Sequence, residues 1–160
     1  MSESLITRQP IALAKIITSL CLVIGLSGCP DEQTLEPFTS DGCSLFPDRA
    51  EAFDQDWCHC CVEHDIAYWK GGTRAEREAA DRTLQSCVAD STGSESLARL
   101  MYEGVRSGGR PEFPTWYRWG YGWSDNRGYQ ALSNEQSRQA ESILMQYRDS
   151  VTKQACGSDL

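Results

Sequence analysis

The sequence predicts a mostly helical domain that is held together by disulfide bonds. No long stretch alternates polar and apolar residues with the period of two that marks a strand. Gly71-Gly72 ends one helical segment, and Thr73 with Glu76 forms a capping box that begins the next. The chain also has eight cysteines in 160 residues, which is typical of a disulfide-stabilised exported domain.

Residues 1–28 have the features of a signal peptide. Arg8 and Lys15 precede an apolar run over residues 16–26, which is too short to span a bilayer. The run ends in Leu26-Ser27-Gly28-Cys29, which resembles the lipobox of bacterial lipoproteins, where the cysteine is lipidated and becomes the first residue. We therefore expect a lipid-anchored protein of the cell envelope, on the periplasmic face or the cell surface. An ordinary signal peptide cut nearby, or a buried N-terminal helix, remains an alternative.

The rest of the chain divides into a tether and one domain. Residues 29–40 are polar and contain Pro30 and Pro37, so we expect a tether there and a folded domain over residues 41–160. That length suits a single core. Six cysteines remain beyond the lipobox, an even number that predicts three disulfides: Cys43, Cys58, Cys60, Cys61, Cys87 and Cys156.

The first half of the domain predicts a loop followed by two helices. Residues 41–48 contain Gly, Pro and two Asp, which favours a loop. A helical pattern extends from about Ala50 to Trp69, and the second helix extends from the Thr73 cap to about Ala89.

The second half predicts two more helices around an irregular segment. Apolar residues between Leu97 and Val105 indicate a third, shorter helix, and residues 107–129 are irregular because they are rich in Gly, Pro and aromatic residues. A last helix begins near Ser133. Its apolar stripe consists of Ala140, Ile143, Leu144, Tyr147 and Val151.

The charge of the chain excludes one class of partner. The formal net charge is −8, whereas binding to nucleic-acid phosphates needs clustered Lys and Arg. We therefore expect no nucleic-acid partner, and no feature of the sequence indicates a protein partner.

The spacing around His64 predicts an imidazole that is oriented by a carboxylate. If Cys60 pairs with Cys87 and the two helices are antiparallel, Asp81 lies within reach of His64 and Tyr68. A carboxylate that holds one imidazole nitrogen leaves the other free to take a proton from water, as a general base does.

These residues resemble those of secreted phospholipase A2. The run Cys-Cys-x-x-His-Asp-x-x-Tyr at residues 60–68, with an Asp six residues before Cys87, matches the motif of that family, and the resemblance covers roughly residues 41–88. It implies a disulfide-linked antiparallel helix pair in which His64 activates water, Asp65 binds Ca²⁺ and Asp81 orients His64 with help from Tyr68. Ala67 and Ala80 stand where the family has a disulfide pair.

The resemblance also implies a calcium loop. Cys43 would bond to Cys61 and hold residues 41–48 over Asp65, so that backbone carbonyls complete the site, and these would come from Gly42, Ser44 and Phe46. The Gly-rich run of the family is replaced here by Ser44-Leu45-Phe46-Pro47, which leaves Asp41 and Asp48 as further candidate ligands. With Cys43–Cys61 and Cys60–Cys87 assigned, Cys58 and Cys156 would form the third disulfide.

The function that the resemblance implies is calcium-dependent hydrolysis of the sn-2 acyl ester of glycerophospholipids. Its partners would be the phospholipid substrate and a membrane surface. The main alternative is a non-catalytic envelope lipoprotein that uses the same scaffold for binding. A third interpretation is a zinc site formed by Cys58-His59-Cys60-Cys61 and His64, although an oxidising compartment favours disulfides.

An aromatic segment at residues 116–123 has more than one interpretation. Aromatic side chains of this type lie well at a membrane interface, and the candidates are Trp116, Trp119, Tyr121 and Trp123. A core segment or a glycan- or peptide-binding surface would show the same pattern.

Overall fold

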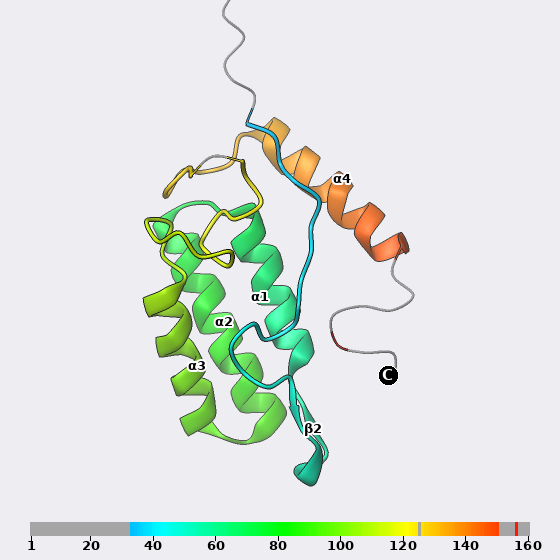
Figure 1. Cartoon of the computed structure of the whole chain (residues 1–160), viewed down its shortest axis with the longest axis vertical. Helices are drawn as coiled ribbons and strands as arrows, with labels where there is room; N and C mark the ends of the chain where they lie inside the picture. The colour runs from blue at the N-terminus through cyan, green and yellow to red at the C-terminus, as the bar shows by residue number, and fades with distance from the viewer. Residues whose placement is uncertain (1–32, 125, 151–155, 157–160) are drawn as a thin grey trace, which may run out of the picture. The chain divides into compact units, whose positions relative to one another are not determined.

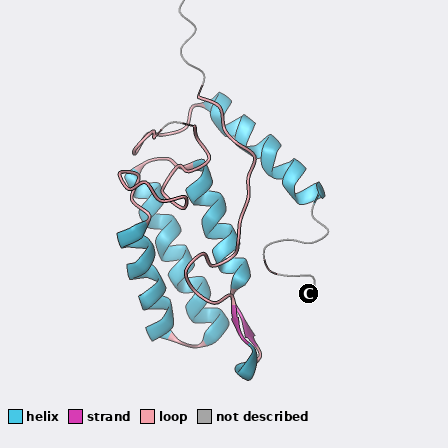
Figure 2. Ribbon diagram, in the orientation of Figure 1, coloured by secondary structure: helices cyan, strands magenta, loops and turns pink. Residues whose placement is uncertain are grey.

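The computed structural model describes residues 33–124, 126–150 and 156. The predictions of a signal peptide and of a lipidated Cys29 lie outside these residues, as does Val151. Four helices dominate the described chain: α1 (Cys58–Lys70), α2 (Arg74–Thr92), α3 (Glu95–Gly108) and α4 (Asn134–Ser150). A small antiparallel sheet of β1 (Arg49–Ala50) and β2 (Gln55–Asp56), joined by the 3-10 turn η1 (Glu51–Phe53), precedes α1 (Figures 1 and 2). The prediction of a mostly helical protein is confirmed.

Helices α1 and α2 form an antiparallel pair. Cys60 is bonded to Cys87 near one end, and His64 contacts Asp81 further along. Helix α3 lies against α2, so the three helices stand side by side (Figure 1). The turn between α1 and α2 needs glycine, because Gly71 has a φ of 69° and a Cβ there would lie 2.9 Å from the Cα of Gly120.

The predicted starts of α2 and α4 are both confirmed, and each is marked by a capping interaction. Thr73 and Glu76 form the expected capping box at the start of α2. Ser133 accepts a hydrogen bond from the backbone N–H of Gln136, whose side chain accepts one in return from the backbone N–H of Ser133, so α4 also begins where expected. These boundaries were predictable because each cap is made by residues three positions apart.

The first helix begins later than expected. The sequence predicts a helix from about Ala50, whereas residues 49–56 form the hairpin and α1 begins at Cys58. Asp54 adopts a left-handed conformation with a φ of 51°, and the carboxylate of Asp56 accepts a hydrogen bond from the backbone N–H of Cys58. Short acidic side chains that bond to nearby backbone compete with helix formation. Here they keep residues 49–56 out of the helix that the apolar periodicity predicts.

Two apolar clusters lie on different faces of α1. The first joins the loop before α1 to the three-helix layer and consists of Cys43, Trp57, Cys60, Cys61, Leu84, Val88, Ala98 and Met101. The second joins α1 to α4 and to two irregular segments, and consists of Leu35, Phe38, Ile66, Trp69, Trp123, Ala140 and Leu144. Helix α1 is therefore the element shared by both cores, and it carries the candidate catalytic residues.

The expected tether is wrong for residues 33–40. Leu35 and Phe38 are buried in the second cluster. The backbone N–H of Glu36 donates to the carbonyl of Gly122, and the Glu36 carbonyl accepts a hydrogen bond from Trp69. The prediction rested on the polar composition of the segment and overlooked these two apolar side chains. Their burial attaches the segment to the domain, so the folded part begins before Asp41.

Three disulfides join the pairs Cys43–Cys61, Cys58–Cys156 and Cys60–Cys87. They are the pairs that the sequence resemblance implies. The second bridge closes a separation of 98 residues and attaches Cys156 to the start of α1.

Within the described residues, no helix is long and apolar enough to cross a membrane.

Candidate active site

His64 and Asp81 form a buried pair between α1 and α2. The Nε2 atom of His64 lies 2.8 Å from Oδ1 of Asp81, and the Asp81 side chain is fully buried. The adjacent Cys60–Cys87 disulfide, one turn before His64 on α1, holds the two helices in this register.

Asp81 is held by three further polar side chains. The hydroxyl of Tyr68 donates to Oδ1 at 2.8 Å, and Arg106 of α3 donates to Oδ2 at 2.7 Å. Arg77, one turn earlier on α2, donates to the Tyr68 hydroxyl at 2.9 Å. Burial by itself would raise the pKa of Asp81, but the hydrogen bonds from His64, Arg106 and Tyr68 outweigh it and lower that pKa. Asp81 is therefore a carboxylate despite its burial.

This arrangement defines which nitrogen of His64 can act as a base. An ionised Asp81 only accepts hydrogen bonds, so Nε2 of His64 carries the proton and its N–H donates a hydrogen bond to Asp81. The Nδ1 atom then has the free lone pair. No partner for Nδ1 occurs among the described residues, and His64 lines a pocket where water can reach it.

Asp65 faces a loop on the neighbouring side of α1. The hydroxyl of Ser40 donates to Oδ2 of Asp65 at 2.6 Å, and the Cys43–Cys61 disulfide attaches the loop to α1 one turn before Asp65. Burial raises the pKa of Asp65 to about 7, and the negative charges of Asp41 and Asp48 add to this, although the Ser40 hydrogen bond opposes it. A half-buried carboxylate among other negative charges is one that a cation would stabilise.

The loop itself is shaped by Gly42 and Asp48. The Asp48 carboxylate accepts a hydrogen bond from the backbone N–H of Cys43 at 2.8 Å. Gly42 has a φ of 78°, and a Cβ at this position would lie 2.4 Å from the Asp48 carboxylate. Only glycine therefore fits the turn that brings residues 42–46 beside Asp65.

The oxygen atoms of this loop fit a hard cation. Within the described part of the chain, no hydrogen-bond donor contacts the backbone carbonyl oxygens of Gly42, Ser44 or Phe46, which are the three carbonyls expected from the sequence. The carboxylate of Asp41, a further candidate ligand, accepts a hydrogen bond from the Ser44 hydroxyl. Calcium prefers carboxylate and carbonyl oxygens, so Asp65 and the three carbonyls are a chemically suitable donor set.

A pocket of about 220 Å³ connects these groups. Its lining includes His64, Asp65 and Tyr68 of α1 together with the loop residues Gly42, Ser44 and Phe46. It also includes apolar residues of α2 and α3: Leu84, Met101, Gly104 and Val105. The pocket therefore joins a candidate general base and a candidate cation site to an apolar surface.

The interfacial role considered for the aromatic segment is wrong for Trp119 and Trp123. Their side chains are 2% and 1% exposed. Trp119 donates to the carbonyl of Gly72 at 2.8 Å, and Trp123 donates to the carbonyl of Lys70 at 2.7 Å. The last carbonyls of a helix lack intrahelical donors, and Trp123 supplies one to Lys70 at the end of α1, while Trp119 supplies one to the turn that follows.

Trp116 and Tyr121 lie differently. Trp116 is 63% exposed, while Tyr121 is half-buried and donates to the carbonyl of Thr39. Both line a second pocket that also reaches Asp65. Of the four aromatic candidates, Trp116 presents the greatest apolar area to solvent.

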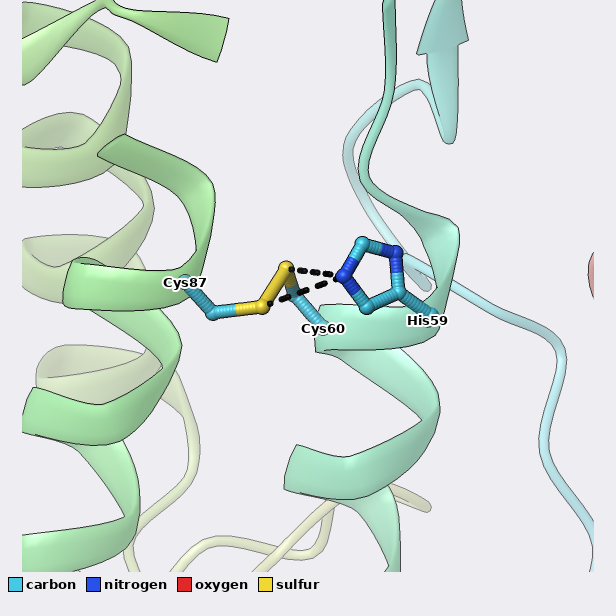
Figure 3. A group of neighbouring side chains, drawn as sticks. All are labelled: His59, Cys60 and Cys87. Atoms are coloured by element: carbon cyan, nitrogen blue, oxygen red, sulfur yellow. Dashed lines mark hydrogen bonds between the residues drawn. A yellow bond between two sulfur atoms is a disulfide. The ribbon is translucent and has the colours of Figure 1, made fainter. Parts of the chain in front are cut away.

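The zinc interpretation does not fit the cysteines. His59, Cys60 and Cys87 do lie together, with Nε2 of His59 at 3.5 Å from each sulfur (Figure 3). The two sulfurs are bonded to each other, however, and Cys58 and Cys61 are also in disulfides. Zinc is bound by thiolates, so these cysteines do not offer a zinc site while the disulfides are intact.

Three residues of the site were missed from the sequence. Arg106 and Ser40 contact Asp81 and Asp65, respectively, from elements distant in the chain, and no local pattern indicated either contact. Arg77 could have been found, because it lies four residues before Asp81 on a predicted helix, where opposite charges meet.

Comparison with known proteins gives one result. No protein-family model, no curated protein and no solved structure matches this chain.

Proposed function

We propose that this protein is a calcium-dependent esterase of the phospholipase A2 type, which hydrolyses the sn-2 acyl ester of glycerophospholipids. The observation that carries the proposal is the buried His64–Asp81 pair at the edge of an apolar pocket. Asp65 and three free loop carbonyls on the same pocket support the requirement for calcium.

In the proposed mechanism, His64 acts on water rather than on the substrate. Nδ1 of His64 takes a proton from a water molecule while the oxygen of that water attacks the ester carbonyl. Asp81 stabilises the imidazolium that results. When the ester C–O bond breaks, His64 returns the proton to the departing glycerol oxygen. The products are a free fatty acid and a lysophospholipid, and no acyl-enzyme forms.

The cation would be held by Asp65 and the carbonyls of Gly42, Ser44 and Phe46. When bound, Ca²⁺ supplies positive charge that polarises the ester carbonyl and offsets the charges of the oxyanion and the phosphate. The neighbouring disulfide, Cys43–Cys61, keeps the loop and Asp65 together before any cation arrives.

The surroundings of the pocket support a lipid substrate. The wall formed by Leu84, Met101 and Val105 suits an acyl chain. Leu45 at the same pocket is 67% exposed, and Trp116 is exposed at the second pocket beside Asp65. Exposed apolar side chains at such a rim are suited to contact with a membrane surface, to which the proposed lipid on Cys29 would anchor the chain.

The test is fatty-acid release from a phospholipid labelled at the sn-2 chain. The oxidised chain should release the label with Ca²⁺ and not with chelator, and His64→Gln should abolish release while its helical content and three disulfides stay unchanged. Release by His64→Gln at the wild-type rate would exclude the mechanism.

One observation favours the alternative of a binding lipoprotein. Phe46, where the family has a Gly-rich run, packs against Gly104, and a Cβ at Gly104 would lie 3.3 Å from the Phe46 ring. A loop held this way could fill the pocket rather than bind calcium. Absence of both turnover and stabilisation by millimolar Ca²⁺ in a folded, oxidised protein would support that alternative.

A further inference from the structure

A third pocket is lined in part by Arg77 and Arg106, two of the residues that support Asp81. It has a volume of about 460 Å³ and shares no lining residue with the candidate active site. Four arginines and two glutamates provide its charged groups: Arg74, Arg77, Arg106, Arg110, Glu103 and Glu112. The pocket therefore carries a positive excess in a chain whose formal net charge is −8.

Two of these arginines have no carboxylate partner among the described residues. Arg74 lies over the ring of Tyr129 at 4.2 Å, and Arg110 lies over the ring of Phe113 at 6.0 Å. Neither guanidinium has a hydrogen bond or an ion pair within the described chain.

Arginines on the exposed faces of the helices are paired in some places and unpaired in others, and Arg99 and Arg148 have no ion pair among the described residues. Arg82 pairs with Glu78 and Arg138 pairs with Glu135, each on its own helix. What distinguishes Arg74 and Arg110 is therefore their position, because they line one pocket together with Arg77 and Arg106.

Two of the lining arginines, Arg77 and Arg106, are held by hydrogen bonds to the protein. Arg77 donates to Tyr129 at 2.8 Å and to the carbonyls of Val105 and Arg106. Arg106 uses Nη1 for Asp81, and its other two nitrogens have no acceptor in the described residues. Arg77 therefore contributes charge but no nitrogen without an acceptor, whereas Arg106, Arg74 and Arg110 have donors with no acceptor among the described residues.

We propose that this pocket binds a phosphate group, either as a free anion or as the headgroup of a phospholipid. Guanidinium groups match phosphate oxygens in geometry and remain charged at all physiological pH values. The open donors come from the start of α2, the end of α3 and the loop after α3, so they approach from several directions. A phosphate offers three or four oxygens and up to two charges to such a set, whereas a carboxylate offers two oxygens in one plane.

The first experiment uses inorganic phosphate and the full chain. Binding is measured by calorimetry in calcium-free buffer at constant ionic strength, with chloride as the reference anion. The double variant Arg74→Gln/Arg110→Gln should weaken phosphate binding at least tenfold. The matched control is Arg82→Gln/Arg138→Gln, which removes the same charge from exposed, paired positions and should leave the affinity unchanged.

The second experiment tests the headgroup source. The full chain is sedimented with phosphatidylglycerol vesicles and with phosphatidylcholine vesicles in calcium-free buffer, where any lipid anchor contributes equally to both. A preference for phosphatidylglycerol that is lost in Arg74→Gln/Arg110→Gln, without measurable binding of inorganic phosphate, assigns the pocket to a headgroup. Phosphate binding without a vesicle preference assigns it to a free anion.

A variant that removes negative charge from the pocket tests the proposal even if the arginine variant fails to fold. Glu103→Gln/Glu112→Gln should raise phosphate affinity or vesicle preference, because it removes the two negative charges of the pocket. The proposal is overturned if neither probe binds, or if the control pair has the same effect as the pocket pair. Neither readout requires ester hydrolysis, so this result is independent of the proposed function.

Discussion

Asp81 is the residue on which the polar network of the site converges. It accepts hydrogen bonds from α1 through His64 and Tyr68 and from α3 through Arg106. A fully buried carboxylate is costly unless it is paired and hydrogen-bonded. Here the groups that reduce this cost are also the groups that determine which nitrogen of His64 is protonated.

Arg106→Gln should therefore affect both stability and activity. It leaves one oxygen of Asp81 without its charged partner, and because Arg106 is partly exposed we expect a loss of about 2 kcal/mol in the free energy of unfolding. The rate of ester hydrolysis should fall about tenfold to a hundredfold, with KM little changed. Urea unfolding and steady-state kinetics measure the two effects. Arg82→Gln is the control, and equal loss of activity in both variants would contradict this role of Arg106.

The environment of Asp65 predicts a pH dependence. Its pKa is about 7 in the folded chain against 3.8 for an unperturbed carboxyl, so between these values the folded state binds more protons than the unfolded state. Ionisation of Asp65 therefore destabilises the folded state. The free energy of unfolding should fall as the pH rises from about 4 to about 7.

In calcium-free buffer at pH 8, Asp65→Asn should consequently be more stable than the wild type, by up to about 4 kcal/mol. The difference should shrink at pH 5. Calcium should stabilise the wild type more at pH 8 than at pH 5, because protons compete for the same carboxylate, and should not stabilise Asp65→Asn. Thermal unfolding at the two pH values tests this, and a calcium response that persists in Asp65→Asn would remove Asp65 from the ligand set.

At the scale of elements, the end of α1 depends on a segment about fifty residues further along the chain. Backbone N–H groups of Gly120 and Gly122 donate to the carbonyls of Tyr68 and Trp69, and two indoles serve the carbonyls of Lys70 and Gly72. Because His64, Asp65 and Tyr68 are on this helix, the segment indirectly positions the site.

Trp119→Phe should therefore destabilise the protein even though the replacement is also aromatic. It leaves the buried carbonyl of Gly72 without its side-chain donor, which should cost about 1–3 kcal/mol. Trp116→Phe is the matched control, because Trp116 is exposed and should change stability by no more than about 0.5 kcal/mol. Similar unfolding midpoints for the two variants would show that the Trp119 hydrogen bond is not needed.

At the scale of the whole molecule, the disulfides connect segments that are distant in sequence. Cys58–Cys156 spans 98 residues and Cys60–Cys87 spans 27. The first joins Cys156 to the start of α1, and the second sets the register of the α1–α2 pair. Their loss should have different consequences.

Removing Cys58–Cys156 through a double Ser substitution should lower the free energy of unfolding by about 2–5 kcal/mol. The loss should exceed that for Cys60–Cys87 by about 1 kcal/mol if loop closure in the unfolded chain dominates. Activity should survive the first change, since neither Cys58 nor Cys156 lines the active-site pocket. Denaturant unfolding of the two double variants gives both values, and the reverse order of stability would show that local contacts outweigh chain entropy.

Local features of the sequence were sufficient for the starts of α2 and α4 and for part of the site, but not for the start of α1. The Gly71-Gly72 turn, the Thr73 capping box and the Ser133 start are each encoded within four residues. The predicted contact of His64 with Asp81 needed only helical periodicity and one assumed disulfide. Such features are predictable because the interacting groups are separated by one helical turn or by one short connection.

Contacts between distant segments were decided only by the tertiary structure. The sequence did not show that Arg106 would reach Asp81, that Leu35 and Phe38 would join the core, or that Trp119 and Trp123 would bond to the end of α1 and the turn that follows. An aromatic or charged side chain has the same local pattern whether it faces water or a buried partner. Its environment depends on which elements pack together, and that follows from burial of apolar surface over the whole chain.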